Sequence, residues 1–209
     1  MKHQIVIVGG GVIGTEYASI LAMIGVSVIL IDKRPRLLEF VDAQIIDALQ
    51  RQMTDIGVTI YHDEEAVAIR KESDGQVTVS LKHRPSITTT TLMYAIGRIG
   101  ATKHLNLEAI GITPDTRGRI IVNDHFQTSV PHIYAAGDVI GFPALASTAM
   151  QQGRHAACHA FGHPDHIDTD LLPYGIYAIP EISMVGRNEE DLAKAGTPYA
   201  AGLAYYREM

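Results

Sequence analysis

Short apolar runs and an amphipathic stretch alternate at the start of the chain. Residues 5–8 and 26–31 are continuous apolar runs rich in β-branched side chains, a pattern typical of parallel strands buried on both faces. The segment between them, from about Gly14 to Ile24, has helical spacing and ends at Gly25. The pattern therefore predicts a strand-helix-strand unit, the building block of α/β folds.

The pattern then continues with a second helix and a third strand. Asp42 is a suitable N-cap for this helix, and Gly57 is a suitable stop. One helical face would carry Ile45, Ile46, Leu49, Met53 and Ile56. Residues 58–61 are predicted to be the third strand.

An antiparallel insert is expected next. Residues 66–70, 76–81 and 86–91 have strand-like composition, and Asp74-Gly75 favours a tight hairpin turn between the first two. Residues 92–96 then form an apolar run that suits the last strand of a nucleotide-binding domain. We therefore expect an α/β, Rossmann-like domain over residues 1–101, with a parallel sheet and an antiparallel insert.

The remaining residues carry weaker signals. We expect short strands at residues 120–122 and 132–135, a helix over about 144–161 and a linker over 164–173. From Tyr174 a further strand and a helix-like stretch at 188–195 follow, without enough sequence to close a domain. This gives predicted divisions at residues 102–170 and 171–209.

Composition narrows the function classes. With 17 basic and 23 acidic residues among 209, the net charge is −6 and no basic block offers contacts to a phosphate backbone, so nucleic acid is not an expected partner. A single cysteine, Cys158, excludes an internal disulfide and favours a reducing compartment, with the cytoplasm as the default. The apolar stretch 18–31 is shorter than the roughly 18 to 20 residues of a membrane span, so no membrane association is expected.

A glycine-rich loop follows the first predicted strand. Gly9 would provide the tight turn, Gly11 the close approach to a pyrophosphate, and Gly14 the helix-strand packing, while Asp32 at the tip of the next strand would bind the adenine ribose. Only glycine lets the backbone come this close to phosphate oxygens. The interpretation is a dinucleotide site; a glycine turn in another α/β fold is the alternative.

The residues after Asp32 bear on which nucleotide binds. A carboxylate accepts hydrogen bonds from a free 2'-hydroxyl and repels a 2'-phosphate, which favours NAD. Lys33, Arg34 and Arg36 follow at once and could hold NADP as well. Our hypothesis is that Arg34 is the main 2'-phosphate ligand, and the alternative is a solvated basic loop.

Several stretches resemble one known family, the class I flavoproteins of the pyridine nucleotide-disulfide oxidoreductases. The resemblance lies in residues 9–16, 95–98, 128–138 and 180–186. Within that class the chain is most similar to the soluble, Si-specific pyridine nucleotide transhydrogenases, judged by residues 11–20, 36–38, 127–132, 174–177 and 179–181. The resemblance spans nearly the whole chain.

This resemblance implies a flavoenzyme that exchanges hydride between NADPH and NAD+, with FAD, NAD and NADP as cofactors. In the family an N-terminal FAD segment precedes the NAD(P) domain, a returning FAD segment follows it, and a C-terminal dimerisation domain closes the chain. Residues 102–170 would be the returning segment and 171–209 the start of the dimerisation domain of a homodimer. The chain is thus expected to be a fragment that lacks the N-terminal FAD segment and is inactive when isolated.

Site residues also follow from the resemblance. Asp138 would bind the ribityl chain of FAD, and the helix that begins near Leu145 and Ala146 would direct its amides at the flavin, where its positive end suits reduced flavin. Glu16 would lie near the nicotinamide, although an acid placed by the helix dipole is an alternative. Val12, a tyrosine in some relatives, would leave nicotinamide entry open. The predicted cofactor-binding set is completed by Ile13, Gly97 and Gly137.

Other interpretations stay open at this stage. A metal site among His155, Cys158, His159, His163 and His166 is disfavoured because the segment already fits a helix. The Gly9 loop could hold FAD instead, but no second nucleotide loop follows. A dihydrolipoamide dehydrogenase or related disulfide reductase would need a Cys-x4-Cys dithiol, which this chain lacks. A third possibility is a nucleotide-binding module without catalysis. No residue is predicted to be catalytic by itself.

Overall fold

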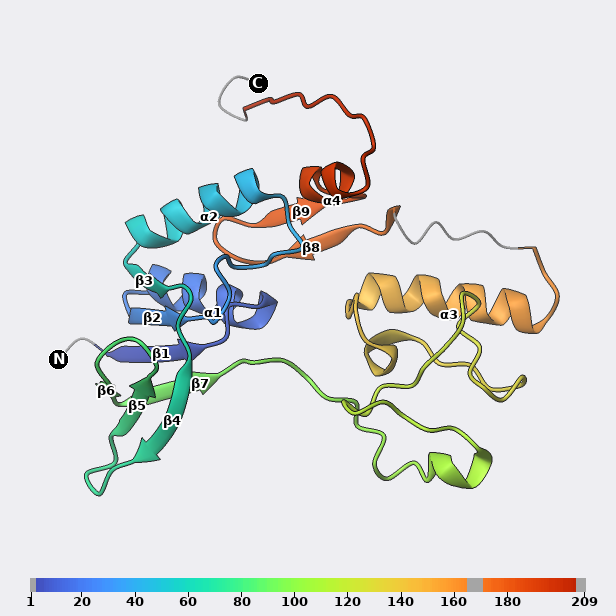
Figure 1. Cartoon of the computed structure of the whole chain (residues 1–209), viewed down its shortest axis with the longest axis horizontal. Helices are drawn as coiled ribbons and strands as arrows, with labels where there is room; N and C mark the ends of the chain where they lie inside the picture. The colour runs from blue at the N-terminus through green and yellow to red at the C-terminus, as the bar shows by residue number, and fades with distance from the viewer. Residues whose placement is uncertain (1–2, 165–170, 206–209) are drawn as a thin grey trace. The chain divides into compact units, whose positions relative to one another are not determined.

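The computed structural model describes residues 3–164 and 171–205, so residues 165–170 of the predicted linker lie outside the described residues. Contacts divide the chain into two compact units, shown in Figure 1. The first contains Met1–Ala95, Ile176–Ile182 and Gly186–Met209, and the second contains Ile96–Gly175 and Ser183–Val185.

The first unit is built on a parallel sheet. Its strands lie in the order β3-β2-β1-β7 and are β1 (Gln4–Val8), β2 (Ser27–Ile31), β3 (Val58–Tyr61) and β7 (Thr91–Tyr94). Val8 pairs with both Ile31 and Tyr94, so the carboxyl ends of β1, β2 and β7 meet at one edge of the sheet. The predicted strands and their α/β arrangement are confirmed, although β7 ends earlier than the predicted residue 96.

Helices α1 (Val12–Met23) and α2 (Ala43–Asp55) lie on one side of this sheet (Figure 1). α1 begins at Val12, slightly before the predicted Gly14, and buries only small residues, which lets it pack closely. The predicted N-cap of α2 is confirmed, because the Asp42 side chain accepts a hydrogen bond from the Gln44 amide at 2.9 Å. The buried face of α2 consists of Ile46, Leu49 and Met53.

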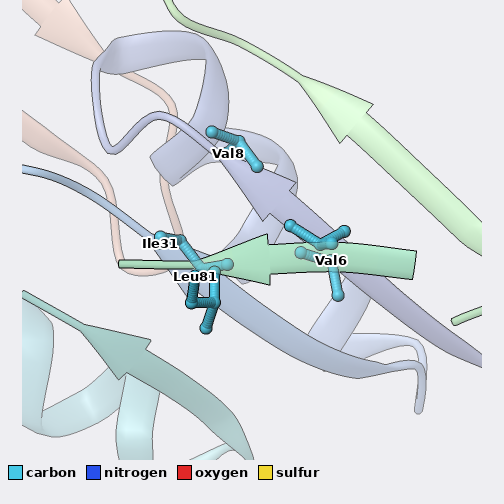
Figure 2. Close-up of a cluster of buried hydrophobic side chains, with 5 residues drawn as sticks. Val6, Val8, Ile31 and Leu81 are labelled. Atoms are coloured by element: carbon cyan, nitrogen blue, oxygen red, sulfur yellow. The ribbon is translucent and has the colours of Figure 1, made fainter. Parts of the chain in front are cut away.

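The predicted antiparallel insert is also confirmed. β4 (Ala66–Lys71), β5 (Val77–Leu81) and β6 (Ile87–Thr89) form a second sheet in the order β4-β5-β6. Figure 2 shows Val6 and Val8 of β1 and Ile31 of β2 beside Leu81 of β5. Together with Val79 these side chains form a buried cluster that joins the two sheets. The first unit therefore has three layers, with helices, parallel sheet and antiparallel sheet in that order.

The second unit contains the 3-10 helices η1 (Leu107–Ile110) and η2 (Gly137–Ile140) and the long helix α3 (Ala146–Ala160). Its small core is centred on Ile112, Ile120 and Ala135. The predicted helix is confirmed, but the strands predicted at residues 120–122 and 132–135 are wrong. The described chain there has one isolated bridge, between Gln127 and Tyr134.

The hydrogen bonds of this region differ from those of a strand ladder. The Asn123 side chain accepts from the amides of His125 and Gln127, both at 3.0 Å, and the Thr128 hydroxyl accepts from the Val130 amide at 3.1 Å. These amides lie between the two predicted strands and form turns there. Within the predicted strands, the Ile120 amide donates to the Val139 carbonyl, Ile133 to Val130 and Ala135 to Phe126, so the backbone bonds go to separate segments and not along one partner strand. The apolar runs therefore pack into the core as irregular segments.

The C-terminal part contains β8 (Tyr174–Ile176), β9 (Ile182–Met184) and α4 (Glu189–Lys194). The strand from Tyr174 and the helix are confirmed, whereas β9, which pairs with β8, was not predicted. Asn188 caps α4 by accepting from the Asp191 amide at 2.7 Å. Its Nδ2 donates to the Phe40 carbonyl at 3.3 Å, which fixes α4 beside the start of α2.

A buried carboxylate holds the antiparallel insert. Glu64 follows β3, and its Oε1 accepts backbone amides from Glu65, Lys82 and His83 at 2.9 to 3.0 Å. Burial by itself would raise the pKa of Glu64, but these amide donors outweigh that effect and hold the pKa below its ordinary value. The ionised form is thus the one that the folded chain favours.

Glu64→Gln is expected to lower the midpoint of thermal unfolding at pH 7, because the amide side chain accepts these bonds without a charge. The folded-state pKa of Glu64 is depressed, so its contribution is present above the ordinary value of about 4.3 and is lost as the pH falls through the folded value. Thermal melts from pH 7 to 3 should therefore show the two proteins converging at low pH. Glu65→Gln, at an exposed neighbour, is the control, and an equal loss in both variants would contradict this role.

Candidate dinucleotide-binding site

The glycine loop connects β1 to α1 by a backbone path that requires glycine. Gly9 has φ of +111°, and its amide donates to the Ile31 carbonyl at 2.8 Å. A Cβ added at Gly14 would overlap the Gly9 carbonyl and would lie 3.5 Å from Cγ2 of Ile7. The loop therefore closes on itself at Gly14, where the helix lies against the first strand.

The N-terminal end of α1 is open to a ligand. Gly11 is its N-cap and supplies no side-chain hydrogen bond, and the first amide bonded within the helix is that of Thr15, to the Gly11 carbonyl at 2.9 Å. The amides of Val12, Ile13 and Gly14 have no intrahelical acceptor at such a position. A Cβ at Gly11 would meet nothing within 4 Å. This free space and these amides suit a pyrophosphate.

Asp32 lies at the tip of β2 and is almost fully buried. Its Oδ2 accepts from the Gly10 amide, and its Oδ1 accepts from the Arg34 amide at 2.8 Å. The Arg34 guanidinium donates to both oxygens, at 2.8 and 2.7 Å. Burial would raise the pKa of Asp32, but the bonds from Arg34 and Gly10 hold it below its usual range. The carboxylate therefore stays ionised and links the glycine loop to Arg34.

The basic residues that the sequence groups together have different surroundings. Lys33 is exposed, whereas Arg34 is bound to Asp32. Arg36 faces two carboxylates, with its Nε 3.8 Å from Asp47 and its Nη1 3.7 Å from Glu190. Sequence reasoning missed Glu190, because its partner lies far along the chain and no local pattern connects them.

Glu16 lies on the second turn of α1, on the same helix as the open amides. Its Oε1 accepts from the Tyr177 amide at 2.8 Å, and the Ser19 hydroxyl accepts from the Ile179 amide at 3.0 Å. The helix that begins at the glycine loop thus also holds the segment Ile176–Ile182. Val12 is half-buried at the first position of α1.

A second group of predicted residues lies in the second unit. The Asp138 carboxylate of η2 forms an ion pair with Arg98 at 2.6 Å, and both side chains remain substantially exposed. Gly97, with φ of +123°, precedes Arg98 after β7. Sequence reasoning assigned Gly97 and left out Arg98. The signal for Arg98 was present in the strand end at residues 95–98.

The N-terminal end of α3 also belongs to this group of predicted residues. The Gly137 amide donates to Oε1 of Gln152 at 2.7 Å, which packs η2 against α3. Leu145 is the N-cap and Ala146 the first residue of α3, and the Thr148 hydroxyl accepts from the Leu145 amide at 3.3 Å. The amides of the first turn, beginning with Ala146, face outward from the helix.

Histidines of α3 form a stack instead of a ligand set. The rings of His125 and His159 stack at 4.2 Å, His125 Nδ1 lies 3.3 Å from His155 Nε2, and the Tyr134 hydroxyl lies 2.8 Å from His159 Nδ1. Among the described residues no group of three or more His, Cys, Asp or Glu side chains is arranged to hold a metal ion. His166 lies outside the described residues.

A Rossmann-like sheet with an open glycine loop at the carboxyl end of its first strand is typical of a dinucleotide-binding domain. The family model of the pyridine nucleotide-disulphide oxidoreductases matches residues 1–153. The chain belongs to this family.

Relatives and solved structures agree with this assignment. The chain is 50% identical over 209 residues to a soluble pyridine nucleotide transhydrogenase of Mycobacterium bovis, and 47% identical over 208 residues to one of Vibrio cholerae. The two matches cover 100% and 99% of this chain but 44% of each relative. The chain therefore spans less than half of the length of these relatives.

Solved structures show the same fold. LpdA from Mycobacterium tuberculosis is 27% identical with a TM-score of 0.84, and the match covers 92% of this chain and 42% of LpdA. The HOCl-induced flavoprotein disulfide reductase RclA from Escherichia coli is 29% identical with a TM-score of 0.81, over 92% of this chain and 44% of RclA.

Gly14→Ala is expected to weaken binding of both NADH and NADPH by more than about tenfold, equivalent to about 1.4 kcal/mol, because the new Cβ would displace the Gly9 carbonyl and with it the loop. Titration calorimetry measures both affinities. Gly153→Ala is the matched control, since this helical glycine has open space at its Cβ. Unchanged nucleotide binding by a folded Gly14→Ala protein would rule out the loop as the site.

Proposed function

We propose that this chain is the NAD(P)-binding and partly flavin-binding portion of a soluble, Si-specific pyridine nucleotide transhydrogenase, an FAD-dependent enzyme that exchanges hydride between NADPH and NAD+. The observation that carries the proposal is the identity of 47–50%, over the whole chain, with proteins of that name. A dihydrolipoamide dehydrogenase has less support. The disulfide reductase RclA is 29% identical.

The glycine loop would bind the two nucleotides in turn. The amides at the start of α1 and the positive end of its helix dipole suit a pyrophosphate, and the space at Gly11 permits a close approach. Neither interaction depends on the 2'-substituent. One loop therefore suits NAD and NADP equally, which an enzyme that exchanges hydride between them needs.

The Asp32–Arg34 pair would receive either form of the adenosine ribose. With a free 2'-hydroxyl, the carboxylate accepts a hydrogen bond while Arg34 stays in place. With a 2'-phosphate, Arg34 turns its guanidinium toward the new charge, and Asp32 keeps its bond from the Gly10 amide. Lys33, exposed next to the pair, would add a second cation.

Glu16 and Val12 would act at the nicotinamide end. Both lie on the first two turns of α1, beyond the position of the pyrophosphate. The Glu16 carboxylate is a hydrogen-bond acceptor, so it suits the carboxamide of the nicotinamide ring. Val12 has a small side chain that leaves the ring free to enter and leave.

Flavin would be held in part by the second unit. The half-exposed Asp138 carboxylate suits the ribityl hydroxyls, Arg98 suits a phosphate of the flavin nucleotide, and the amides at Leu145 and Ala146 suit the negative edge of the ring. Bound FAD would supply the two-electron chemistry that these side chains lack. The role of this chain is to position the cofactor and to balance its charge.

Further features of the whole protein are part of this proposal. We assign residues 1–101 to an NAD(P) domain, 102–170 to a returning segment of an FAD domain and 171–209 to the start of a dimerisation domain of a homodimer. A cytoplasmic location suits the reducing compartment expected from the single cysteine. Within the described residues, no helix is long and apolar enough to cross a membrane.

Arg34→Ala is expected to weaken NADPH binding by roughly 10- to 100-fold, the value of a lost charge-assisted hydrogen bond, and to change NADH binding by less than about threefold. Titration of the purified chain with each nucleotide measures both. Arg51→Ala, at an exposed position on α2, is the control. Equal weakening of both nucleotides would mean that Arg34 serves the fold and not the phosphate.

Exchange activity is tested in the full length of a relative. In a chimera in which this chain replaces the matching 44% of the Vibrio cholerae relative, we expect bound FAD and hydride transfer from NADPH to thio-NAD+. A folded, flavin-loaded chimera that transfers no hydride would argue against the proposed reaction.

Asp138→Asn in this chimera should lower the flavin content, read from absorbance, by more than about tenfold, since a charge-assisted bond is lost.

A further inference from the structure

Residues 33–38 form a strap that lies against the glycine loop. Leu37 is fully buried and occupies the space that a Cβ on Gly10 would need. The Leu38 amide donates to the Gly10 carbonyl at 3.4 Å, and Asp32, which precedes the strap, accepts from the Gly10 amide. The strap that carries the basic side chains is therefore held against the loop that is proposed to bind the pyrophosphate.

The charges on the strap are unequally balanced. Arg34 is paired to Asp32 at 2.7 Å, and Arg36 lies 3.8 Å from Asp47 and 3.7 Å from Glu190. Lys33 has no ion pair within the described parts of the chain. A 2'-phosphate at the strap would thus meet one cation that is free to respond and two that are shared with carboxylates.

Glu190 is held in place more firmly than an ordinary surface acid. Its Oε1 accepts from the Ala43 amide at 3.1 Å, at the first residue of α2. Its Oε2 is buried and makes no hydrogen bond within the described residues. α4, which carries Glu190, is fixed by Asn188 to the Phe40 carbonyl at 3.3 Å. The carboxylate is therefore a fixed negative charge facing Arg36 from the C-terminal segment.

We infer that Glu190 is a specificity-determining positioning residue, which holds Arg36 away from the adenosine 2'-phosphate and so keeps the affinities for NADPH and NADH close to each other. The inference rests on the proposed function. Its physical basis is the fixed acid, because a guanidinium shared between two carboxylates attracts a third anion less strongly than a free one. An enzyme that binds both nucleotides at one loop is slowed if one of them is bound much more tightly than the other.

Glu190→Gln tests the inference. The amide oxygen can still accept from Ala43, so the docking of α4 is preserved while the charge is removed. We expect the Kd for NADPH to fall about three- to tenfold at low ionic strength and the Kd for NADH to stay within about twofold. The gain should shrink as salt is raised toward 1 M, where the screening length is about 3 Å.

Two further variants separate this effect from general changes of charge or fold. Asp191→Asn removes the same charge from the same helix at an exposed position and should leave the ratio of the two Kd values unchanged. In the background of Arg36→Gln, the Glu190→Gln change should no longer tighten NADPH binding, because its effect acts through Arg36. Thermal melts confirm that each variant is folded.

The outcomes are distinct. An unchanged ratio in Glu190→Gln, or an equal gain in Asp191→Asn, overturns the inference while NADH binding still supports the proposed site. A gain that persists in the Arg36→Gln background also overturns it, because Glu190 would then act on the phosphate directly. Failure of the unaltered chain to bind either nucleotide would reject the proposed function itself.

Discussion

The hydrogen bonds of the Asp32 carboxylate hold together the parts of the candidate site. A buried carboxylate is costly unless it is paired and hydrogen-bonded, and here Gly10 and Arg34 supply those bonds. Through them the tip of β2, the glycine loop and the strap become one rigid assembly. This assembly fixes the loop that leads into the open end of α1.

The parts of the fold that could be predicted are those determined by local patterns. The apolar runs of β1 and β2, the Asp42 cap and the Asp74-Gly75 turn all act within a few residues, and all appear in the structure. The strands predicted at 120–122 and 132–135 are wrong because their backbone amides donate to separate carbonyls, Ile120 to Val139, Ile133 to Val130 and Ala135 to Phe126. β9 was not predicted because a strand of three residues is defined by its pairing, here with β8, and not by a pattern in its own sequence.

The same distinction applies to the candidate site. The glycines and Asp32 carry a spacing that is visible in sequence, since backbone geometry demands glycine there. The ion pairs of Arg98 with Asp138 and of Arg36 with Glu190 join residues far apart in the chain. No periodicity encodes such pairs. Sequence reasoning therefore identified one member of each pair, but it could not identify the partner that neutralises its charge.

The two units use a related arrangement. In each, a carboxylate is paired with an arginine, Asp32 with Arg34 and Asp138 with Arg98, and each unit contains a helix whose N-terminal amides are left open. A carboxylate accepts from sugar hydroxyls, whereas an arginine and helix amides donate to phosphate. A dinucleotide presents both kinds of group. The acid and the arginine also neutralise each other when no ligand is present, so neither charge is left unpaired. A nucleotide bound as proposed would therefore exchange one partner for another instead of meeting an isolated charge.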